Sequence, residues 1–306
     1  MDEKTKMKFK AHQSFFIRKG WLGKGLRGVL EDPALLMPIN SKIAMDELGL
    51  GSNQVVALRY WLETAGLIRK RNKFHSIEEL GALILEKDPY FEEAGTLWAL
   101  HCNIASAESD ATSWYFFFNE FKMNSFDRDD FTHAIERYVF AHGDKTKVAR
   151  TSLEADFSCI LNTYIPHERT GGRQSSPESV IDCPLGELGL VDVDSVSERK
   201  YRKKPASTNA LPAWLVLYAI CPSIREFETG DPETEREIRL DVLLEGPRMP
   251  GRVYNLDSVG LLTKLYELES DGLLRITRTA GLDVIRITDP AMTKEDCLAN
   301  YYELLD

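Results

Sequence analysis

The sequence predicts a mainly α-helical α+β protein, with a winged helix-turn-helix at the N-terminus, a helical middle and a second winged helix at the C-terminus. Three observations indicate this fold class. Residues 44–62 have the spacing of small and apolar side chains that a helix-turn-helix requires, and a basic hairpin pattern follows them. Helical periodicity dominates residues 76–164. The order of helix, turn, helix and hairpin recurs at residues 238–288.

These patterns divide the chain into four expected segments. They are a winged-helix domain (1–75), a helical domain (76–166), a linker (167–182) and a C-terminal winged-helix-like α+β domain (183–306). The linker is assigned because residues 167–177 contain two glycines, two serines and two arginines but no large apolar side chain. Such a composition cannot contribute to a packed core.

In the first domain, turn residues separate the elements. A short helix is expected over residues 42–48, and Gly49 begins the break that ends it. A second helix is expected from Ser52 to about Ala65, and the glycine that follows ends it because glycine readily adopts positive φ. Residues 67–74 are expected to form two short strands around a polar turn at residues 69–72.

Gly49 also fits the turn position of a twenty-residue helix-turn-helix core, where the backbone is left-handed. The five small or apolar positions of that core are then occupied by Ala44, Leu48, Leu50, Val55 and Leu58. Met45 stands where alanine is usual, which is a departure from the pattern. The second helix should bury its apolar face and leave Asn53, Gln54, Ala57 and Tyr60 nearer solvent.

These positions supply the candidate DNA contacts. Asn and Gln side chains can pair with adenine edges, and Arg and Lys side chains can reach phosphates. The predicted DNA-binding residues are Arg18, Lys19, Lys24, Asn53, Gln54, Arg59, Arg69, Lys70, Arg71 and Lys73. The aromatic side chains near the first of these cations, Phe15, Phe16 and Trp21, are expected to bury against the first domain.

Charge supports this assignment. The formal net charge is −10, yet residues 1–75 hold 14 Lys/Arg against 7 Asp/Glu. Residues 76–306 hold the remaining 24 basic and 41 acidic side chains. Such asymmetry hints that the basic part contacts nucleic acid, so duplex DNA is the expected partner. The alternative is that the winged helix docks a protein and that its charges are merely solvated, so a protein-protein adaptor stays open.

Further helices are expected over residues 95–105, 127–140, 152–164, 211–220, 234–244 and 258–270, with strands over 191–202, 274–277 and 283–288. The helix over residues 258–270 resembles a recognition helix, but four acidic side chains lie on or beside it, at Asp257, Glu267, Glu269 and Asp271. Acidic side chains make a poor surface for DNA. We therefore expect this C-terminal unit to contact protein or to form a homodimer.

Several classes of protein are not expected. The five cysteines are scattered without a C-x-x-C pair, so buried reduced thiols and a cytoplasmic location are expected. The first residues do not form a secretory signal. The longest apolar run, from Trp214 to Cys221, is about half of the roughly 18–20 residues that a membrane span needs.

No catalytic motif is found either, so the protein is expected to be non-catalytic, with no metal and no cofactor. Glycine-rich phosphate loops, nucleophile elbows and zinc or kinase strings do not occur. A metal-dependent nuclease using Asp127, Asp129 and Asp130 is the alternative. Against it, Asp127 is better explained as the N-cap of the following helix.

Four strings give a wider resemblance: residues 12–25 (HQSFFIRKGWLGKG), 95–101 (GTLWALH), 111–119 (ATSWYFFFN) and 183–190 (CPLGELGL). They are similar to strings of an uncharacterised bacterial family that is catalogued as a domain of unknown function. Its members tend to be encoded beside DNA phosphorothioation enzymes that resemble phosphoadenosine-phosphosulfate reductases. The resemblance implies a role in bacterial DNA modification or phage defence. It suggests no catalytic residues.

Overall fold

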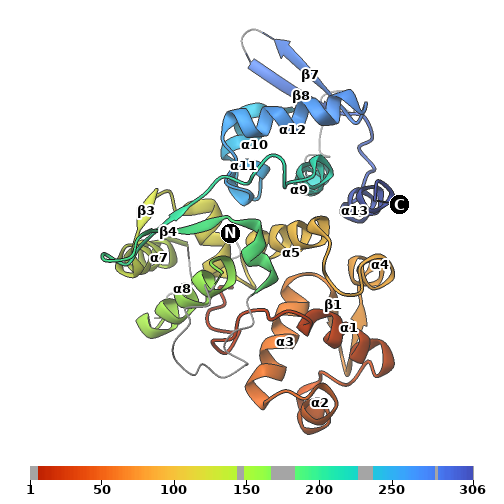
Figure 1. Cartoon of the computed structure of the whole chain (residues 1–306), viewed down its shortest axis with the longest axis vertical. Coiled ribbons are helices and arrows are strands. Elements are labelled where there is room, and N and C mark those ends of the chain that lie inside the picture. The colour runs from red at the N-terminus through yellow and green to blue at the C-terminus, as the bar shows by residue number, and fades with distance from the viewer. Residues whose placement is uncertain (1–5, 143–147, 167–182, 227–236, 280–281, 306) are drawn as a thin grey trace.

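A computed structural model describes residues 6–142, 148–166, 183–226, 237–279 and 282–305. Most of these residues are helical, and the strands form three small antiparallel sheets within the described ranges. The predicted mainly helical α+β class is therefore confirmed at this level. Figure 1 shows the N-terminal helices at the bottom of the view and the C-terminal hairpin at the top, with α5 and α8 between them.

The N-terminal unit consists of three helices and a hairpin. Its elements are α1 (Trp21–Glu31), a 3-10 turn (Pro38–Asn40), α2 (Ser41–Leu48), α3 (Ser52–Thr64), β1 (Ile68–Arg71) and β2 (Phe74–Ile77). The predicted breaks are confirmed, because Gly49 and Gly66 have φ values of 61° and 75° where α2 and α3 end. Helix α3 contacts both α1 and α2, and β1 follows it directly. A hydrogen bond of 2.8 Å from the His75 amide to the Pro33 carbonyl ties β2 to the α1–α2 connection.

The middle unit is a helical layer with one small sheet. It comprises α4 (Glu79–Lys87), α5 (Ala94–Ser106), α6 (Thr112–Tyr115), a π-helical turn (Phe116–Glu120), β3 (Ser125–Phe126), α7 (Arg128–His142), α8 (Arg150–Tyr164), a 3-10 turn (Pro184–Leu188), β4 (Val191–Ser195) and β5 (Lys200–Lys203). The sheet has the order β3-β5-β4. Helix α5 is buried on almost every side, which its nearly continuous apolar sequence explains.

A buried polar cluster joins the N-terminal segment to this layer. The ring of His12 lies with its Nε2 atom 2.7 Å from the Asp156 carboxylate on α8. Because the Ser14 amide donates to His12 Nδ1, the proton of the neutral ring lies on Nε2 and is donated to the carboxylate. The Ser113 hydroxyl and the Lys10 amide donate to the same carboxylate, at 2.6 and 2.9 Å. Asp156 therefore holds three segments together.

The C-terminal unit contains α9 (Ala213–Glu226), β6 (Glu237–Arg239), α10 (Leu240–Glu245), α11 (Pro250–Val253), α12 (Ser258–Ser270), β7 (Leu274–Thr279), β8 (Leu282–Ile287) and α13 (Lys294–Glu303). The expected helix over 234–244 is wrong at its start. Residues 237–239 form a strand instead, because Ile238 pairs with Ile285 of β8 in a three-stranded sheet of order β6-β8-β7. Residues 234–236 and the linker at 167–182 lie outside the described residues.

The last helix returns to the first half of the chain. Helix α13 contacts α9, α5 and α4, as its place at the right of Figure 1 shows. The Tyr302 hydroxyl lies 2.5 Å from the hydroxyl of Thr96, which donates to the Asp88 carboxylate at 2.6 Å. The buried apolar side chains of all these elements form one continuous core. The four predicted segments stay a prediction.

All five cysteines are buried, and Cys221 Sγ lies 3.6 Å from Cys297 Sγ. Across the described ranges, no helix combines the length and the apolar character that crossing a membrane requires.

Candidate nucleic-acid interface

The N-terminal hairpin presents the predicted cations on two paired strands. β1 and β2 are antiparallel and pair from Ile68–Ile77 to Arg71–Phe74, which leaves Asn72-Lys73 as a two-residue turn. The turn is therefore shorter than the expected polar turn at residues 69–72, because the strands stay paired as far as Arg71 and Phe74. The four basic side chains of the hairpin are all exposed: Arg69, Lys70, Arg71 and Lys73.

One carboxylate lies beside these cations. Glu78 follows β2, and its side chain lies 3.0 Å from Arg69 Nε and 3.5 Å from Arg71 Nη2. Arg71 Nε also donates to the Ser76 hydroxyl at 3.2 Å. Among the described residues, no side chain pairs with Lys70 or Lys73. Among the described residues, Glu78 is thus the one carboxylate that pairs with the four cations of the hairpin.

The base of the hairpin is anchored in the core. Ile68 and His75 are buried, and His75 Nε2 lies 3.1 Å from a carboxylate oxygen of Glu63 on α3. Together with the bond from the His75 amide to the Pro33 carbonyl, these contacts fix the hairpin to α3 and to the α1–α2 connection. The cations therefore project from a rigid support.

Helix α3 is less open than the sequence suggests. Ala57 and Tyr60, expected nearer solvent, are only 0% and 8% exposed, so that expectation is wrong. The cause is a second packing face, on which the Tyr60 hydroxyl donates to the Asp110 carbonyl at 3.0 Å and Trp61 Nε1 donates to the Phe15 carbonyl at 2.9 Å. The middle unit therefore covers a side of α3 that a free helix-turn-helix leaves open.

The three predicted contact residues on α3 differ in their surroundings. Asn53 is exposed in the first turn. The Gln54 side chain accepts a hydrogen bond of 2.8 Å from the Gly51 amide, which stabilises the helix start. Arg59 is half-buried, and its Nη1 donates to the Leu36 carbonyl at 3.1 Å.

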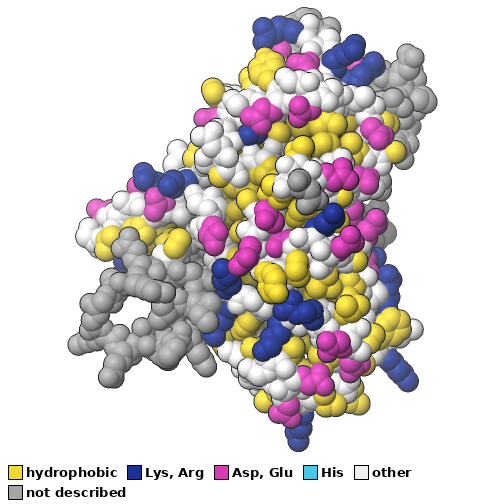
Figure 2. All heavy atoms as spheres, turned by 45° about the vertical axis from the view of Figure 1, so that its right-hand side comes forward, with side chains coloured by type: hydrophobic (Ala, Val, Ile, Leu, Met, Phe, Trp, Pro, Cys, Tyr) yellow, Lys and Arg dark blue, Asp and Glu magenta, His cyan; other side chains and the backbone are white. Residues whose placement is uncertain are grey.

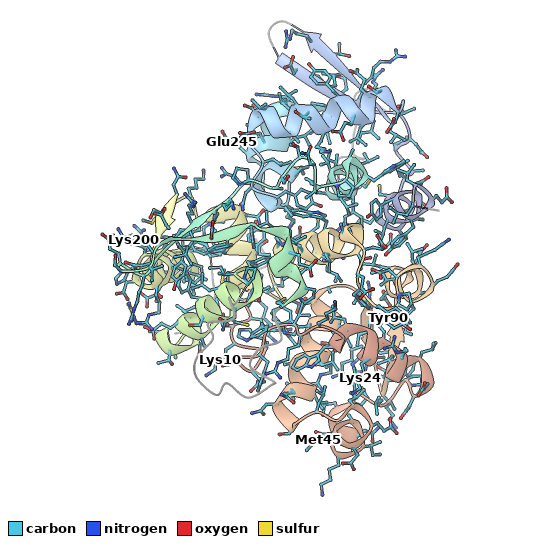
Figure 3. All side chains as sticks on the ribbon, in the orientation of Figure 1. Lys10, Lys24, Met45, Tyr90, Lys200 and Glu245 are labelled. Carbon is cyan, nitrogen blue, oxygen red and sulfur yellow. The ribbon has the colours of Figure 1, made fainter. Side chains whose placement is uncertain are left out.

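The predicted cations before and on α1 also make internal contacts. The Arg18 guanidinium lies 5.8 Å from the ring centre of Phe15 and 5.4 Å from that of Trp21. Lys19 lies 3.6 Å from a Glu92 oxygen. Lys24, which Figure 3 labels in the lower unit, donates through Nζ to the last carbonyl of α2, at Leu48, at 2.5 Å. Trp21 is 7% exposed and so is buried as expected, whereas Phe15 and Phe16 pack against the core but are only partly buried.

Sequence reasoning missed Glu78. Its proximity to Arg69 and Arg71 follows once the hairpin turn is known to contain two residues, because strand pairing then brings residue 78 beside residue 69. The turn length decides which residues pair across the hairpin. The four-residue turn expected from the sequence implies a different pairing, in which Glu78 is not placed near Arg69.

The three acidic residues considered for a nuclease form a helix cap. Asp127 accepts from the Asp130 amide at 2.9 Å, and Asp130 accepts from the Asp127 amide at 3.0 Å, so the two close the start of α7 reciprocally. Asp129 pairs with Arg150 Nη2 at 2.8 Å. Within the described part of the chain, no three His, Cys, Asp or Glu side chains group as metal ligands would.

Charges of both signs share the surface. Figure 2 shows Lys and Arg side chains interspersed with Asp and Glu across the visible face, with apolar side chains between them.

The sequence of the chain matches one protein family over almost its whole length. A family described as "Protein of unknown function (DUF4007)" matches residues 9–302. The chain belongs to this family. The predicted membership of an uncharacterised family is thereby confirmed, whereas the gene neighbourhood beside phosphorothioation enzymes stays a prediction.

Two solved structures are similar over nearly the whole chain. A "Magnesium ion-bound SspB crystal structure" has a TM-score of 0.85 and 26% identity, and covers 98% of this chain and 89% of that one. An "SspB crystal structure" has a TM-score of 0.84 and 27% identity over the same shares. No curated protein matches the chain.

Proposed function

We propose that this protein is a DNA-binding component of a bacterial DNA phosphorothioation or phage-defence system. In this proposal α1 to β2 act as a winged helix, and the hairpin is the principal contact with duplex DNA. The observation that carries the proposal is the exposed hairpin, on which Lys70 and Lys73 have no partner among the described side chains. The family resemblance and the similarity to SspB support the assignment to such a system.

The N-terminal elements support the winged-helix interpretation. Three helices precede a hairpin, and the turn between the second and third helices has left-handed Gly49. The His75 amide of β2 donates to the Pro33 carbonyl, so a segment of the α1–α2 connection lies beside this strand. Winged helices commonly have a short third strand at this place.

Each exposed residue then has a role. Lys70 and Lys73 contact phosphates directly. Arg69 and Arg71 leave the Glu78 carboxylate and bind phosphate instead, because one guanidinium group can donate to two phosphate oxygens at once. Asn53 lies at the open end of α3, where it can reach a base edge. Arg18, Lys24 and Arg59 act as supports for this unit, because their cationic groups already contact its rings and carbonyls.

Salt-dependent binding tests the proposal. Fluorescence anisotropy with a labelled duplex should show binding at about 50 mM salt that weakens steeply as salt rises, because phosphate contacts release counterions. The double variant Lys70→Gln/Lys73→Gln should bind about tenfold more weakly at low salt, and its salt slope should fall by about 2.

The matched control removes two cations from another hairpin. Arg199→Gln/Lys200→Gln lies in the β4–β5 hairpin, and Lys200 is labelled at the far edge of the middle unit in Figure 3. This variant should bind as the natural chain does. Undetectable binding at about 50 mM salt, or equal losses in both double variants, overturns the proposal.

The proposal includes no catalytic step. One similar structure is described as magnesium-bound SspB, so the assay is repeated on supercoiled plasmid with Mg²⁺ and with a chelator. We expect binding without strand breakage. Magnesium-dependent nicking that persists in freshly purified chain and disappears with the chelator would contradict the non-catalytic assignment.

A second candidate function is that of an adaptor which docks partner enzymes of the same system. The outward face of α12 favours it, because Val259 and Tyr266 lie two helical turns apart and are 71% and 52% exposed. Co-purification with a sulfur-transfer enzyme or ATPase, unaffected by nuclease, should then be lost in Val259→Asp/Tyr266→Asp. The Lys70→Gln/Lys73→Gln variant should retain the partner.

A further inference from the structure

A cavity of about 460 Å³ lies between the middle and C-terminal units, remote in sequence from the N-terminal hairpin. Its wall is built by the segment after the π-helical turn, the end of β5, α10, α11 and the start of α12. The charged side chains that line it are Lys122, Lys203, Lys204, Glu245, Arg252 and Asp257. Cations thus outnumber carboxylates in the wall. The volume is within the range that small-molecule sites occupy.

Neither carboxylate compensates the cations of the wall strongly. Asp257 accepts from the Gly260 amide at 2.7 Å and so closes the start of α12. Glu245, labelled beside α10 in Figure 3, is 71% exposed in its side chain and lies 3.9 Å from Arg252 Nη2. At that distance and exposure, its attraction for Arg252 is weak. The wall therefore carries positive charge that its own acidic groups compensate poorly.

Lys203 is a cation of the wall that has neutral partners only. Its Nζ donates to the carbonyls of Phe117 and Phe121 and lies 4.8 Å from the ring centre of Phe117. These partners are neutral, and no described carboxylate pairs with this ammonium group. Burial, reinforced by the positive charge of Arg252, lowers the pKa of Lys203 to about 7. A charged amine in such a place is destabilised until an anion approaches.

The other two lysines differ in availability. Lys204 lies 3.5 Å from an Asp192 carboxylate oxygen on β4, so part of its charge is already balanced. Lys122 is exposed and has no side-chain partner among the described residues. Lys122, Lys203 and Arg252 are therefore the three groups that an anion in the cavity would compensate.

We propose that this cavity binds the phosphoryl group of a nucleotide, either free or at the end of a DNA strand. Lys203 and Arg252 supply the buried side of the contact and Lys122 the open side. A phosphate has several acceptor oxygens, so it can accept from an ammonium and a guanidinium together. The cavity is separate from the N-terminal hairpin. A failure of the hairpin to bind duplex DNA would therefore not affect phosphate binding in the cavity.

Calorimetric titration of the full chain tests the proposal with three probes. They are adenosine 5′-monophosphate, a 5′-phosphorylated single-stranded tetranucleotide and unphosphorylated adenosine. The two phosphorylated probes should bind saturably at one site, and adenosine should not. Arg252→Gln and Lys122→Gln should each weaken the binding about tenfold, the effect of losing one charge-assisted contact.

Control variants locate the site. Lys200→Gln lies on the same strand as Lys203 but does not line the cavity, so it should bind the phosphorylated probes normally. Lys203→Met is checked for folding first, since its ammonium group holds the carbonyls of Phe117 and Phe121. Arg252→Gln and Lys122→Gln decide the question if that variant unfolds.

The relative affinities of the two phosphorylated probes distinguish a DNA end from a free nucleotide. Tetranucleotide binding about tenfold tighter than that of the mononucleotide supports a DNA end, and the reverse order or equal affinity supports a free nucleotide. The absence of saturable binding of either phosphorylated probe at about 10 mM overturns the proposal. Unchanged affinity in both Arg252→Gln and Lys122→Gln overturns it as well.

Discussion

His101 illustrates how single buried groups are stabilised in this protein. Its Nε2 lies 2.7 Å from the Val253 carbonyl, and its Nδ1 lies 2.8 Å from the Tyr164 hydroxyl. A carbonyl can only accept, so Nε2 carries the proton and Nδ1 accepts from the tyrosine. The ring is fully buried, and no carboxylate of the described residues pairs with it. Burial lowers the pKa of His101 to about 4.

This neutral histidine predicts acid sensitivity. In the unfolded chain His101 gains a proton near pH 6.5, whereas in the folded protein it does so near pH 4, so stability falls as pH drops through that interval. Between pH 7 and pH 5 the expected loss of unfolding free energy from this group is about 2 kcal/mol. Denaturant unfolding at the two pH values measures it.

The control for this measurement is His101→Gln. Glutamine can keep one donor and one acceptor but does not titrate, so the variant should lose that part of the pH dependence whatever its stability at pH 7. An identical pH dependence in both proteins would mean that His101 is protonated without cost in the folded state.

At the scale of elements, the turn between α2 and α3 depends on one conformation. Gly49 has a φ of 61°, and the Leu50 amide that follows donates to the Met45 carbonyl at 3.1 Å. A left-handed residue at this place lets the chain leave α2 and start α3 within three residues. The orientation of α3, and with it the hairpin, follows from that turn.

Replacement of this glycine should therefore destabilise the N-terminal unit. Gly49→Ala is expected to lower the unfolding free energy by about 1–2 kcal/mol, because a Cβ disfavours the left-handed region. Gly49→Asn should cost clearly less, since asparagine adopts that region more readily. Thermal unfolding of both variants measures the difference, and equal losses would show that bulk, rather than backbone conformation, is the cause.

Local features of this fold could be predicted from the sequence, whereas features that depend on distant residues could not. The breaks at Gly49 and Gly66 and the basic hairpin are set by neighbouring residues, so local patterns predicted them. The burial of Tyr60 depends on Asp110, and the strand at Ile238 depends on Ile285; neither partner is near in sequence. For the candidate site, the hairpin cations were predicted, whereas Glu78 and the cavity around Lys203 required the three-dimensional arrangement.

For the whole molecule, the decisive contact is the one between α13 and α5. A Cβ at Gly95 would lie 2.3 Å from the Tyr301 ring, so the two helices approach as closely as a glycine allows. Cys297, Leu298 and Tyr302 of the same helix are buried in the common core. The C-terminal helix therefore contributes packing to elements that lie some two hundred residues earlier, as the Thr96–Tyr302 contact illustrates.

Gly95→Ala tests this contact. The added methyl must displace the Tyr301 ring, so the unfolding free energy should fall by about 1–3 kcal/mol, the usual cost of overpacking. The control Gly186→Ala places its Cβ an ordinary 3.4 Å from Pro166 and should change stability little. Denaturant midpoints of the two variants measure the effect. Equal midpoints would mean that α13 moves aside without cost.

The position of α13 has a consequence for how the protein is made. Its core residues are synthesised after those of α4 and α5, so these two helices emerge with a side that nothing yet covers. Domains generally fold as units during synthesis, from the N-terminal one onward. Here the early helices reach their final packing only after α13 has been synthesised, and until then a chaperone or a neighbouring nascent chain can contact the uncovered surface.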